Sequence, residues 1–304
     1  MKQFAFLTMG DRTFFHSICY SIWNINRLYP TTLIYVYDWG FTDFQKKYLE
    51  SGKNTVLIPW NKRFVDISIS FSSWREKLSL VHGMRGWKDF LPYIRKPRMI
   101  FDNQDYAKFL KREMLFVNKV LCMQDYLKNH GNNFIFLDGD AVVVQCIDEL
   151  LNDSFDIGVT LRESNEIVIL PKSCSVLNVG VLFFLGGNIK NTLFIDYWME
   201  RIYNTHERFI EQSALTQLLF ESNTNIFENY KEVIIHISRE DFRVKVLPCR
   251  VYNHYRAKKY GVTKENKIVH FKSLNYRKEV FYKFLEELGL PIPAEIEVIR
   301  QEYL

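Results

Sequence analysis

The chain has 304 residues, which is enough for one large domain or two small ones. Apolar residues make up 47% and charged residues 25%, a balance that excludes a largely disordered chain, and 13 Gly and 8 Pro are too few for a collagen-like or linker-like sequence. The net charge of +5 is milder than in dedicated nucleic-acid-binding domains, so we expect no nucleic-acid partner.

Strand and helix patterns alternate at the start of the chain. Short apolar, β-branched or aromatic runs predict strands, and apolar residues at helical spacing predict helices. The expected strands are 4–8, 32–37 and 55–59, and the expected helices are 14–28 and 43–50, the second with Thr42 as its N-cap. This alternation is typical of a parallel sheet covered by helices.

The segment 61–105 is rich in Trp, Arg and Lys without clear periodicity, so we expect loops and short helices there. After it, strand and helix patterns return. The expected strands are 134–137, 141–144, 157–161, 167–170, 176–185, 244–247 and 268–271. The expected helices are 107–129, 147–151, 191–204, 209–221 and 281–288, with a last helical stretch after Pro293. We therefore predict an α/β fold, with one mixed domain over 1–275 and a C-terminal helical extension over 276–304.

The N-terminus and the cysteines bear on where the protein works. Gly10, Asp11 and Arg12 interrupt a short apolar run, so the N-terminus is a poor signal peptide. The longest apolar run, 176–185, is far shorter than the roughly 20 residues of a spanning helix. None of the five cysteines forms a C-x-x-C pair, which argues against a structural zinc site. We expect a cytoplasmic protein with at most peripheral membrane contact.

The sharpest chemical feature is the sequence FIFLDGDAVVV, in which an apolar strand ends at Asp138 and Asp140. In extended backbone these two carboxylates face the same side, and together they offer the oxygen ligands that Mg²⁺ or Mn²⁺ prefers. Gly139 between them lets the backbone turn and a ligand come close. Since ligands bind beyond the carboxyl ends of strands in open α/β sheets, we interpret the pair as a metal site rather than a solvated turn.

FLDGDAVV resembles the D-x-D motif of GT-A-fold glycosyltransferases, which use nucleotide-sugar donors. Other segments are similar, in the same order, to motifs of glycosyltransferase family 8 and its relatives, over most of residues 4–275. They are FAFLTMGD, LIYVYDWGFTDFQKKYL, LNVGVLFF, IEQSALTQLL and IVHFKS. The family's H-x-x-G-x-x-K-P-W pattern is not kept, because the matching positions here are His270, Ser273 and Tyr276 and no Pro-Trp follows. The chain therefore resembles a relative outside the core of that family.

The resemblance implies a role for each matching residue. The metal would be held by Asp138, Asp140 and His270, as Mn²⁺ or Mg²⁺. The donor nucleotide would contact Thr8 and Asp38 at its nucleoside, and Asp138, Lys272 and Arg277 at its diphosphate. The catalytic residues near the donor sugar would be Glu211, Gln212 and Asn178.

Other residues are candidates for the rim of the site. Arg162 and Glu163 follow an expected strand and could border the sugar. Aromatic faces pack against sugar rings, which suggests an acceptor cleft. Its candidates are Trp74, Trp87, Tyr93, Tyr252 and Tyr255.

Taken together, these residues predict a metal-dependent transfer of a sugar from a nucleoside-diphosphate donor, with a UDP-sugar favoured, to a hydroxyl of a glycan, lipid-linked or protein-linked acceptor. The resemblance favours retention of the anomeric configuration. One alternative is a HAD-type phosphatase using Asp138 and Asp140, but that motif normally opens its domain and no second acidic cluster follows here. The other alternative is a non-catalytic module that binds a nucleotide-sugar.

Overall fold

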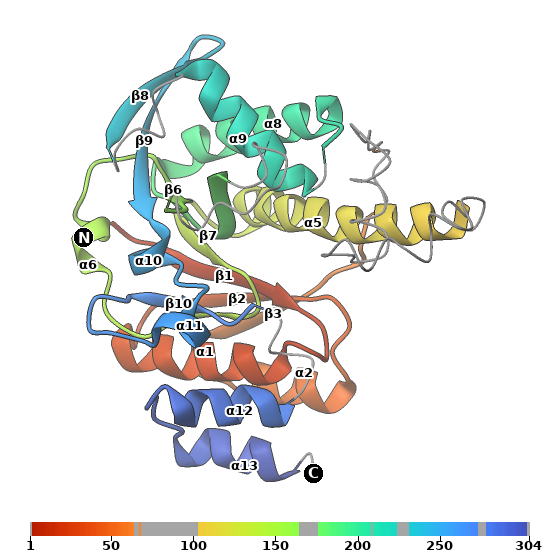
Figure 1. Cartoon of the computed structure of the whole chain (residues 1–304), viewed down its shortest axis with the longest axis vertical. Coiled ribbons are helices and arrows are strands. Elements are labelled where there is room, and N and C mark those ends of the chain that lie inside the picture. Colours follow the sequence, from red (N-terminus) through yellow and green to blue (C-terminus); the bar gives the residue numbers. More distant parts are fainter. Residues whose placement is uncertain are drawn as a thin grey trace.

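The computed structural model describes residues 2–63, 67, 103–163, 176–207, 209–223, 231–272 and 278–302. An eight-stranded mixed sheet runs through the middle of the molecule in the order β3-β2-β1-β4-β7-β6-β9-β8 (Figure 1). Its strands are β1 Ala5–Gly10, β2 Ile34–Asp38, β3 Thr55–Pro59, β4 Phe134–Leu137, β6 Ile157–Leu161, β7 Leu177–Phe184, β8 Glu232–Ile237 and β9 Glu240–Pro248. A small second sheet pairs β5 Ala141–Val143 with β10 Ile268–His270. The predicted mixed α/β architecture is confirmed.

The first part of the chain folds as its pattern predicts. Strands β1, β2 and β3 pair in parallel, and helices α1 Phe15–Leu28 and α2 Asp43–Glu50 connect them. Thr42 is the N-cap of α2, because its hydroxyl accepts a hydrogen bond from the Gln45 amide at 3.3 Å and the Gln45 side chain accepts one from the Thr42 amide at 3.0 Å. This reciprocal pair satisfies two amides that the first helical turn leaves without partners.

One face of the sheet is covered by α5 Asn103–Asn129, α8 Gly187–Asn204 and α9 Ile210–Ser222 (Figure 1). Large aromatic side chains fill this layer, with Trp198 fully buried and the rings of Phe134 and Phe184 stacked 4.6 Å apart across β4 and β7. The sequence is 16% aromatic, with 25 Phe and 17 Tyr, and much of this content is therefore core packing.

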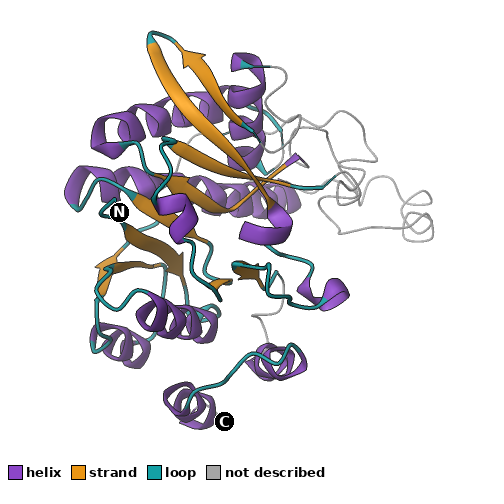
Figure 2. Cartoon of the chain, turned by 90° about the vertical axis from the view of Figure 1, so that its left-hand side faces the viewer, coloured by secondary structure: helices purple, strands orange, loops and turns teal. Residues whose placement is uncertain are grey.

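The opposite face is covered by α1 and α2, and the C-terminal helices α12 Lys278–Glu287 and α13 Ala294–Glu302 pack outside α1 (Figure 2). The Tyr20 hydroxyl donates to the Pro291 carbonyl at 3.0 Å, and Nδ1 of His16 lies 3.0 Å from the Tyr282 hydroxyl. The C-terminal helices thus share an apolar layer with α1, and the domain boundary at residue 275 stays a prediction.

The segment after α9 differs most from the sequence prediction. The expected strand over 244–247 is the end of a longer strand, β9, which forms a hairpin with β8, and this hairpin projects from the sheet (Figure 2). Short helices α10 Cys249–Tyr252 and α11 Ala257–Tyr260 follow it. The short helix expected over 147–151 is α6 Asp148–Leu151. The strand expected over 167–170 and most of the segment 61–105 lie outside the described residues.

The strand register brings the functional segments to one edge of the sheet. Gly10 pairs with Asp38 and Thr8 with Leu137, so β1, β2 and β4 end together. Strand β7 runs antiparallel to β4 and β6, so its beginning lies at the same edge, where Leu161 pairs with Leu177. Within the described ranges, no helix carries an apolar stretch long enough to span a membrane.

Candidate active site

Three predicted metal ligands meet at this edge. Ligand atoms of Asp138, Asp140 and His270 all lie within 4.8 Å of one another. Nε2 of His270 is 2.9 Å from Oδ1 of Asp140 and 3.8 Å from Oδ2 of Asp138. The small sheet makes the meeting possible, because its antiparallel register places His270 opposite Ala141, directly after the two aspartates. Two carboxylates and one imidazole suit Mn²⁺, so these residues fit a divalent cation.

The two aspartates come together by a different route from the one expected. The backbone is not extended between them but turns, and the Ala141 amide donates to the Asp138 carbonyl at 2.8 Å. A Cβ on Gly139 would lie 2.6 Å from the Met9 carbonyl oxygen, so this glycine is required by the close approach of β1. The Ser17 hydroxyl of α1 donates to the Gly139 carbonyl at 2.6 Å and fixes the turn from behind.

Gly180 in β7 leaves the space that the imidazole ring of His270 occupies. A Cβ at this position would lie 2.2 Å from Cε1 of His270 and 2.9 Å from Oδ2 of Asp138, closer than real atoms approach. The Asp138 amide also donates to the Gly180 carbonyl at 2.8 Å. The glycine of the LNVG sequence is therefore needed for the contact between β7 and the side chains of Asp138 and His270.

Lys119 on α5 is a site residue that the sequence analysis missed. Its ammonium is buried, 2.8 Å from Oδ1 of Asp138 and 3.6 Å from Oε1 of Glu211. Burial alone would lower the pKa of Lys119, but Asp138 and Glu211 outweigh it and raise the pKa, so the side chain carries its charge. The available signal was a lysine inside the apolar helical sequence FVNKVLCM, where a solvated lysine is not expected.

Glu211 and Asn178 lie in the same buried region, as the resemblance implied. Glu211 lies in the first turn of α9 and is 3% exposed. Burial raises the pKa of its carboxyl, and Lys119 opposes part of that rise. Among the described residues, neither Oε2 of Glu211 nor Nδ2 of Asn178 has a hydrogen-bond partner. Buried polar atoms are normally paired, so these two mark where a polar ligand would bind. Gln212, next on α9, accepts a hydrogen bond of 3.5 Å from the Val179 amide.

The charge of Asp140 suits a metal ligand. Burial would raise the pKa of this carboxyl, but the neighbouring His270 and Lys272 outweigh burial and hold the pKa below its usual value. Asp140 is therefore ionised at neutral pH, which is the form that binds a cation.

Three cationic side chains gather around the ring of Tyr255, close to the metal ligands. The Lys272 ammonium lies 4.9 Å from the ring centroid, and the guanidinium carbons of Arg162 and Arg256 lie at 5.3 and 5.6 Å. Lys272 follows His270 by two residues, and it is exposed. Such a cluster attracts an anionic group.

Other predicted rim residues lie elsewhere. The Tyr252 hydroxyl donates to Glu149 at 3.0 Å and contacts none of the metal ligands. Arg277, Trp74, Trp87 and Tyr93 lie outside the described residues.

The two predicted nucleoside contacts, Thr8 and Asp38, lie at the same edge of the sheet as the aspartates. Thr8 is a buried residue of β1, and its contact with a nucleoside stays a prediction. Asp38 is already engaged: Oδ1 accepts from the Gly40 and Phe41 amides at 2.8 and 2.7 Å, and Oδ2 pairs with Lys46 at 3.0 Å. Burial would raise the pKa of Asp38, but these partners together lower it. The observed role of Asp38 is to form the turn after β2, and its contact with a base also stays a prediction.

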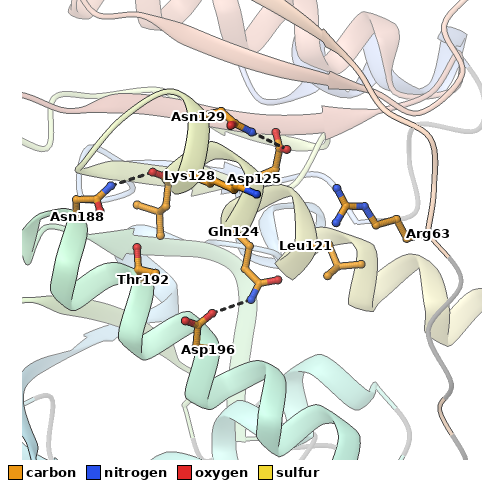
Figure 3. Close-up of a pocket in the computed structure, with 10 residues that line it drawn as sticks. Arg63, Leu121, Gln124, Asp125, Lys128, Asn129, Asn188, Thr192 and Asp196 are labelled. Carbon is orange, nitrogen blue, oxygen red and sulfur yellow. Dashed lines mark hydrogen bonds between the residues drawn. The ribbon is translucent and has the colours of Figure 1, made fainter.

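A polar groove of about 540 Å³ lies between α5 and α8 but contains none of these residues (Figure 3). Its side chains mostly satisfy each other: Gln124 donates to Asp196 at 2.8 Å, and Asn129 donates to Asp125 at 3.0 Å. The site is therefore assigned to the sheet edge and not to this groove.

Solved structures with the same fold are glycosyltransferases. A galactosyltransferase, LgtC, in complex with donor and acceptor sugar analogues, is 13% identical with a TM-score of 0.51, over 96% of this chain and 98% of its own. The bifunctional glycosyltransferase WbbM is 12% identical with a TM-score of 0.55, over 99% of this chain and 52% of its own. GlyE of Streptococcus pneumoniae TIGR4 is 13% identical with a TM-score of 0.51, over 100% of this chain and 63% of its own. The predicted GT-A fold is confirmed.

The sequence itself also carries a family signature. No curated protein matches it. The model of the galactosyl transferase GMA12/MNN10 family matches residues 65–280, which is more than half of the chain and includes Asp138, Asp140, His270, Lys119 and Glu211. The chain therefore belongs to the galactosyl transferase GMA12/MNN10 family and is a glycosyltransferase with the GT-A fold.

Proposed function

We propose that this glycosyltransferase moves a hexosyl or pentosyl group from a UDP-sugar to a hydroxyl of a glycan, lipid-linked or protein-linked acceptor, with a divalent cation and with retention of configuration. The observation that carries the proposal is the trio Asp138, Asp140 and His270, whose ligand atoms lie within 4.8 Å of one another. The description of the family makes UDP-galactose the first donor to test.

The trio's chemistry supports the metal requirement. A divalent cation held there would neutralise negative charge on the diphosphate as it leaves. Imidazole binds Mn²⁺ better than Mg²⁺, so Mn²⁺ is the metal we expect to be preferred. The ionised state of Asp140, argued above from its pKa, supports the same assignment.

The cations around Tyr255 support the diphosphate site. Lys272 and Arg162 lie 4.9 and 5.3 Å from the ring centroid, and both come from the sheet edge that carries the trio. Cationic groups placed where charge develops stabilise the transition state. We assign the predicted diphosphate contact to Lys272, with Arg162 beside it, and keep Arg277 as a candidate by resemblance.

The two unpartnered atoms described above support the sugar site. A sugar hydroxyl can donate to Oε2 of Glu211, and another can accept from Nδ2 of Asn178. The Glu211 carboxylate would also stabilise positive charge that develops on the sugar as the diphosphate leaves. Lys119 would hold this carboxylate in place, and Gln212 would hold the adjoining β7 backbone through the Val179 amide.

The central experiment measures release of UDP from UDP-galactose, UDP-glucose and UDP-xylose with Mn²⁺, and identifies the anomer of the product by NMR. We expect one UDP-sugar to be turned over with retention. Asp140→Ala should lower turnover by more than about 100-fold while circular dichroism stays unchanged, since it removes a ligand. Asp241→Asn, an exposed aspartate on the β8–β9 hairpin, is the control and should keep full turnover.

Each alternative predicts a different result. An Asp140→Ala protein with normal turnover refutes the metal assignment. Phosphate release from a phosphosugar, without turnover of any nucleotide-sugar, points to phosphatase chemistry. Donor binding without turnover, even with acceptors present, points to a non-catalytic module, and product of inverted configuration refutes the assignment of retention.

A further inference from the structure

We propose that Asn253 is a positioning residue of the metal site: its side-chain oxygen keeps a proton on Nδ1 of His270, so that Nε2 is the nitrogen that binds the cation. The inference rests on the metal-dependent function proposed above, and it adds a residue that none of the recognised motifs contains. Asn253 directly follows α10, and its side chain contacts His270.

The contacts of Asn253 are short and buried. Its side chain is fully buried, and Nδ2 lies 2.8 Å from the Thr160 hydroxyl and 2.8 Å from the Asn178 carbonyl oxygen. Oδ1 lies 2.8 Å from Nδ1 of His270, which is 3% exposed. Both donors of this amide and one lone pair of its oxygen are therefore matched inside the protein.

These partners determine which way the amide points. A backbone carbonyl oxygen can only accept, so the Asn253 atom beside the Asn178 carbonyl must be the NH₂ group. The Thr160 hydroxyl agrees, because it donates its single hydrogen to the same Asn178 carbonyl at 2.6 Å and so can only accept from Asn253. The oxygen of Asn253 is thereby directed at His270.

The orientation of the amide then decides the chemistry of the imidazole. An amide oxygen only accepts, so Nδ1 of His270 must carry a proton in order to pair with it. A nitrogen that holds a proton cannot bind a metal, which leaves Nε2, the nitrogen beside Asp138 and Asp140. Partners of this kind fix the ring orientation and the basicity of metal-binding histidines, and their loss typically costs about 10–100-fold in metal affinity.

The same amide also connects the metal ligand to the proposed sugar site. Its NH₂ group binds the backbone of Asn178, whose own side chain holds the unpartnered Nδ2. Strand β6 joins this network through Thr160. The buried Asn253 side chain therefore links His270 to β7, the strand that would contact the donor sugar.

The test uses the full chain with Mn²⁺ alone, without donor or acceptor. Electron paramagnetic resonance of free Mn²⁺ measures affinity, and electron spin echo modulation detects a bound ¹⁴N nucleus. Wild type should show the nitrogen signal, and His270→Gln should lack it. Asn253→Ala should bind Mn²⁺ about 10–100-fold more weakly with the nitrogen signal lost or reduced.

A matched control separates positioning from general stability. Asn191 on α8 is also fully buried, donates to the Asn132 carbonyl at 2.7 Å and accepts from the Gly186 amide at 3.2 Å, but lies outside the site. Asn191→Ala should lower the melting temperature and leave both Mn²⁺ measurements at wild-type values. If Asn253→Ala behaves in the same way as Asn191→Ala, the proposal is overturned.

Asn253→Asp keeps the test decisive if the alanine variant fails to fold. Aspartate retains an oxygen for Nδ1 of His270 but loses the amide donors. It should keep the nitrogen signal and an affinity closer to wild type than to a His270→Gln protein. Loss of the nitrogen signal in the folded aspartate variant would overturn the proposal. A wild-type protein that binds no Mn²⁺ would instead refute the proposed function itself, which distinguishes the two failures.

Discussion

Replacing Lys119 by methionine removes the one positive charge that we find between Asp138 and Glu211 in the described structure. Methionine has a similar length and no charge, so the change isolates electrostatics from packing. Glu211 is buried and its pKa is already raised, so it cannot remain ionised without this partner. We expect Lys119→Met to be less stable than the wild-type protein.

The size of the effect follows from the two distances. Charges 2.8 and 3.6 Å apart attract each other by about 6 and about 5 kcal/mol at an effective dielectric constant of about 20. The cost of burying the ammonium offsets much of this attraction, and removing one partner of a buried ion pair costs about 3–5 kcal/mol. With an unfolding entropy of about 2.1 cal/mol/K per residue over 304 residues, this corresponds to a fall of about 5–8 °C in Tm.

Thermal unfolding followed by circular dichroism measures the effect against two reference variants. Lys190→Met removes an ion pair of the same length, 2.8 Å to Asp156, in which the lysine is 38% exposed. Asp156 is buried but keeps a hydrogen bond from the Arg243 amide at 2.9 Å, so this variant should lose less stability than Lys119→Met. The double variant Lys119→Met with Glu211→Gln also removes the buried carboxyl group that has lost its cationic partner. It should recover at least half of the stability that Lys119→Met loses. If Lys119→Met and Lys190→Met have the same Tm, or if the double variant is no more stable than Lys119→Met, the electrostatic reasoning is refuted.

Two further predictions concern other parts of the molecule. Gly180→Ala should abolish measurable Mn²⁺ binding while the protein still unfolds cooperatively, because the new Cβ would lie 2.2 Å from Cε1 of His270; unchanged Mn²⁺ affinity would show that the site can rearrange. For His16, burial and the nearby Lys278 lower the pKa to about 4 from its ordinary 6.5. Because the pKa of His16 is lower in the folded protein than in the unfolded chain, its contribution to the free energy of unfolding is complete above pH 6.5. This contribution is lost as the pH falls from 6.5 towards 4, by up to about 3 kcal/mol at 1.36 kcal/mol per pH unit. Urea unfolding should show this slope in wild type and not in His16→Phe; equal slopes in both proteins would count against it.

Local patterns predicted the central elements well because their evidence is contained in a few residues. The apolar runs that form β3, β4 and β6 are bounded by turn residues, and their limits match the prediction. Strand β8 was missed because it is an edge strand in which apolar residues do not mark the buried positions. Ile234, for example, is 54% exposed. Edge strands are determined by pairing with a distant neighbour, which a short sequence window does not contain.

The same distinction applies to the site. Asp138 and Asp140 stand two residues apart after an apolar strand, so sequence alone indicated a metal site. His270 was found only through a family resemblance, since one histidine in a short apolar run carries no signal of its own. Lys119 and Asn253 were missed because lysine on a helix and asparagine after a helix usually face solvent, and only the fold brings them to the aspartates and to His270.

Helix α1 lies between the aspartate turn of the candidate site and the C-terminal helices. Its inner side holds the Gly139 carbonyl through Ser17, and its outer side is covered by the C-terminal helices through Tyr20 and His16. A shortened protein that stops before α12 would place apolar side chains of α1 in water, on the very element that supports the aspartate turn. For expression, engineering or crystallisation, the last two helices therefore belong to the catalytic unit, although none of their side chains takes part in the proposed reaction.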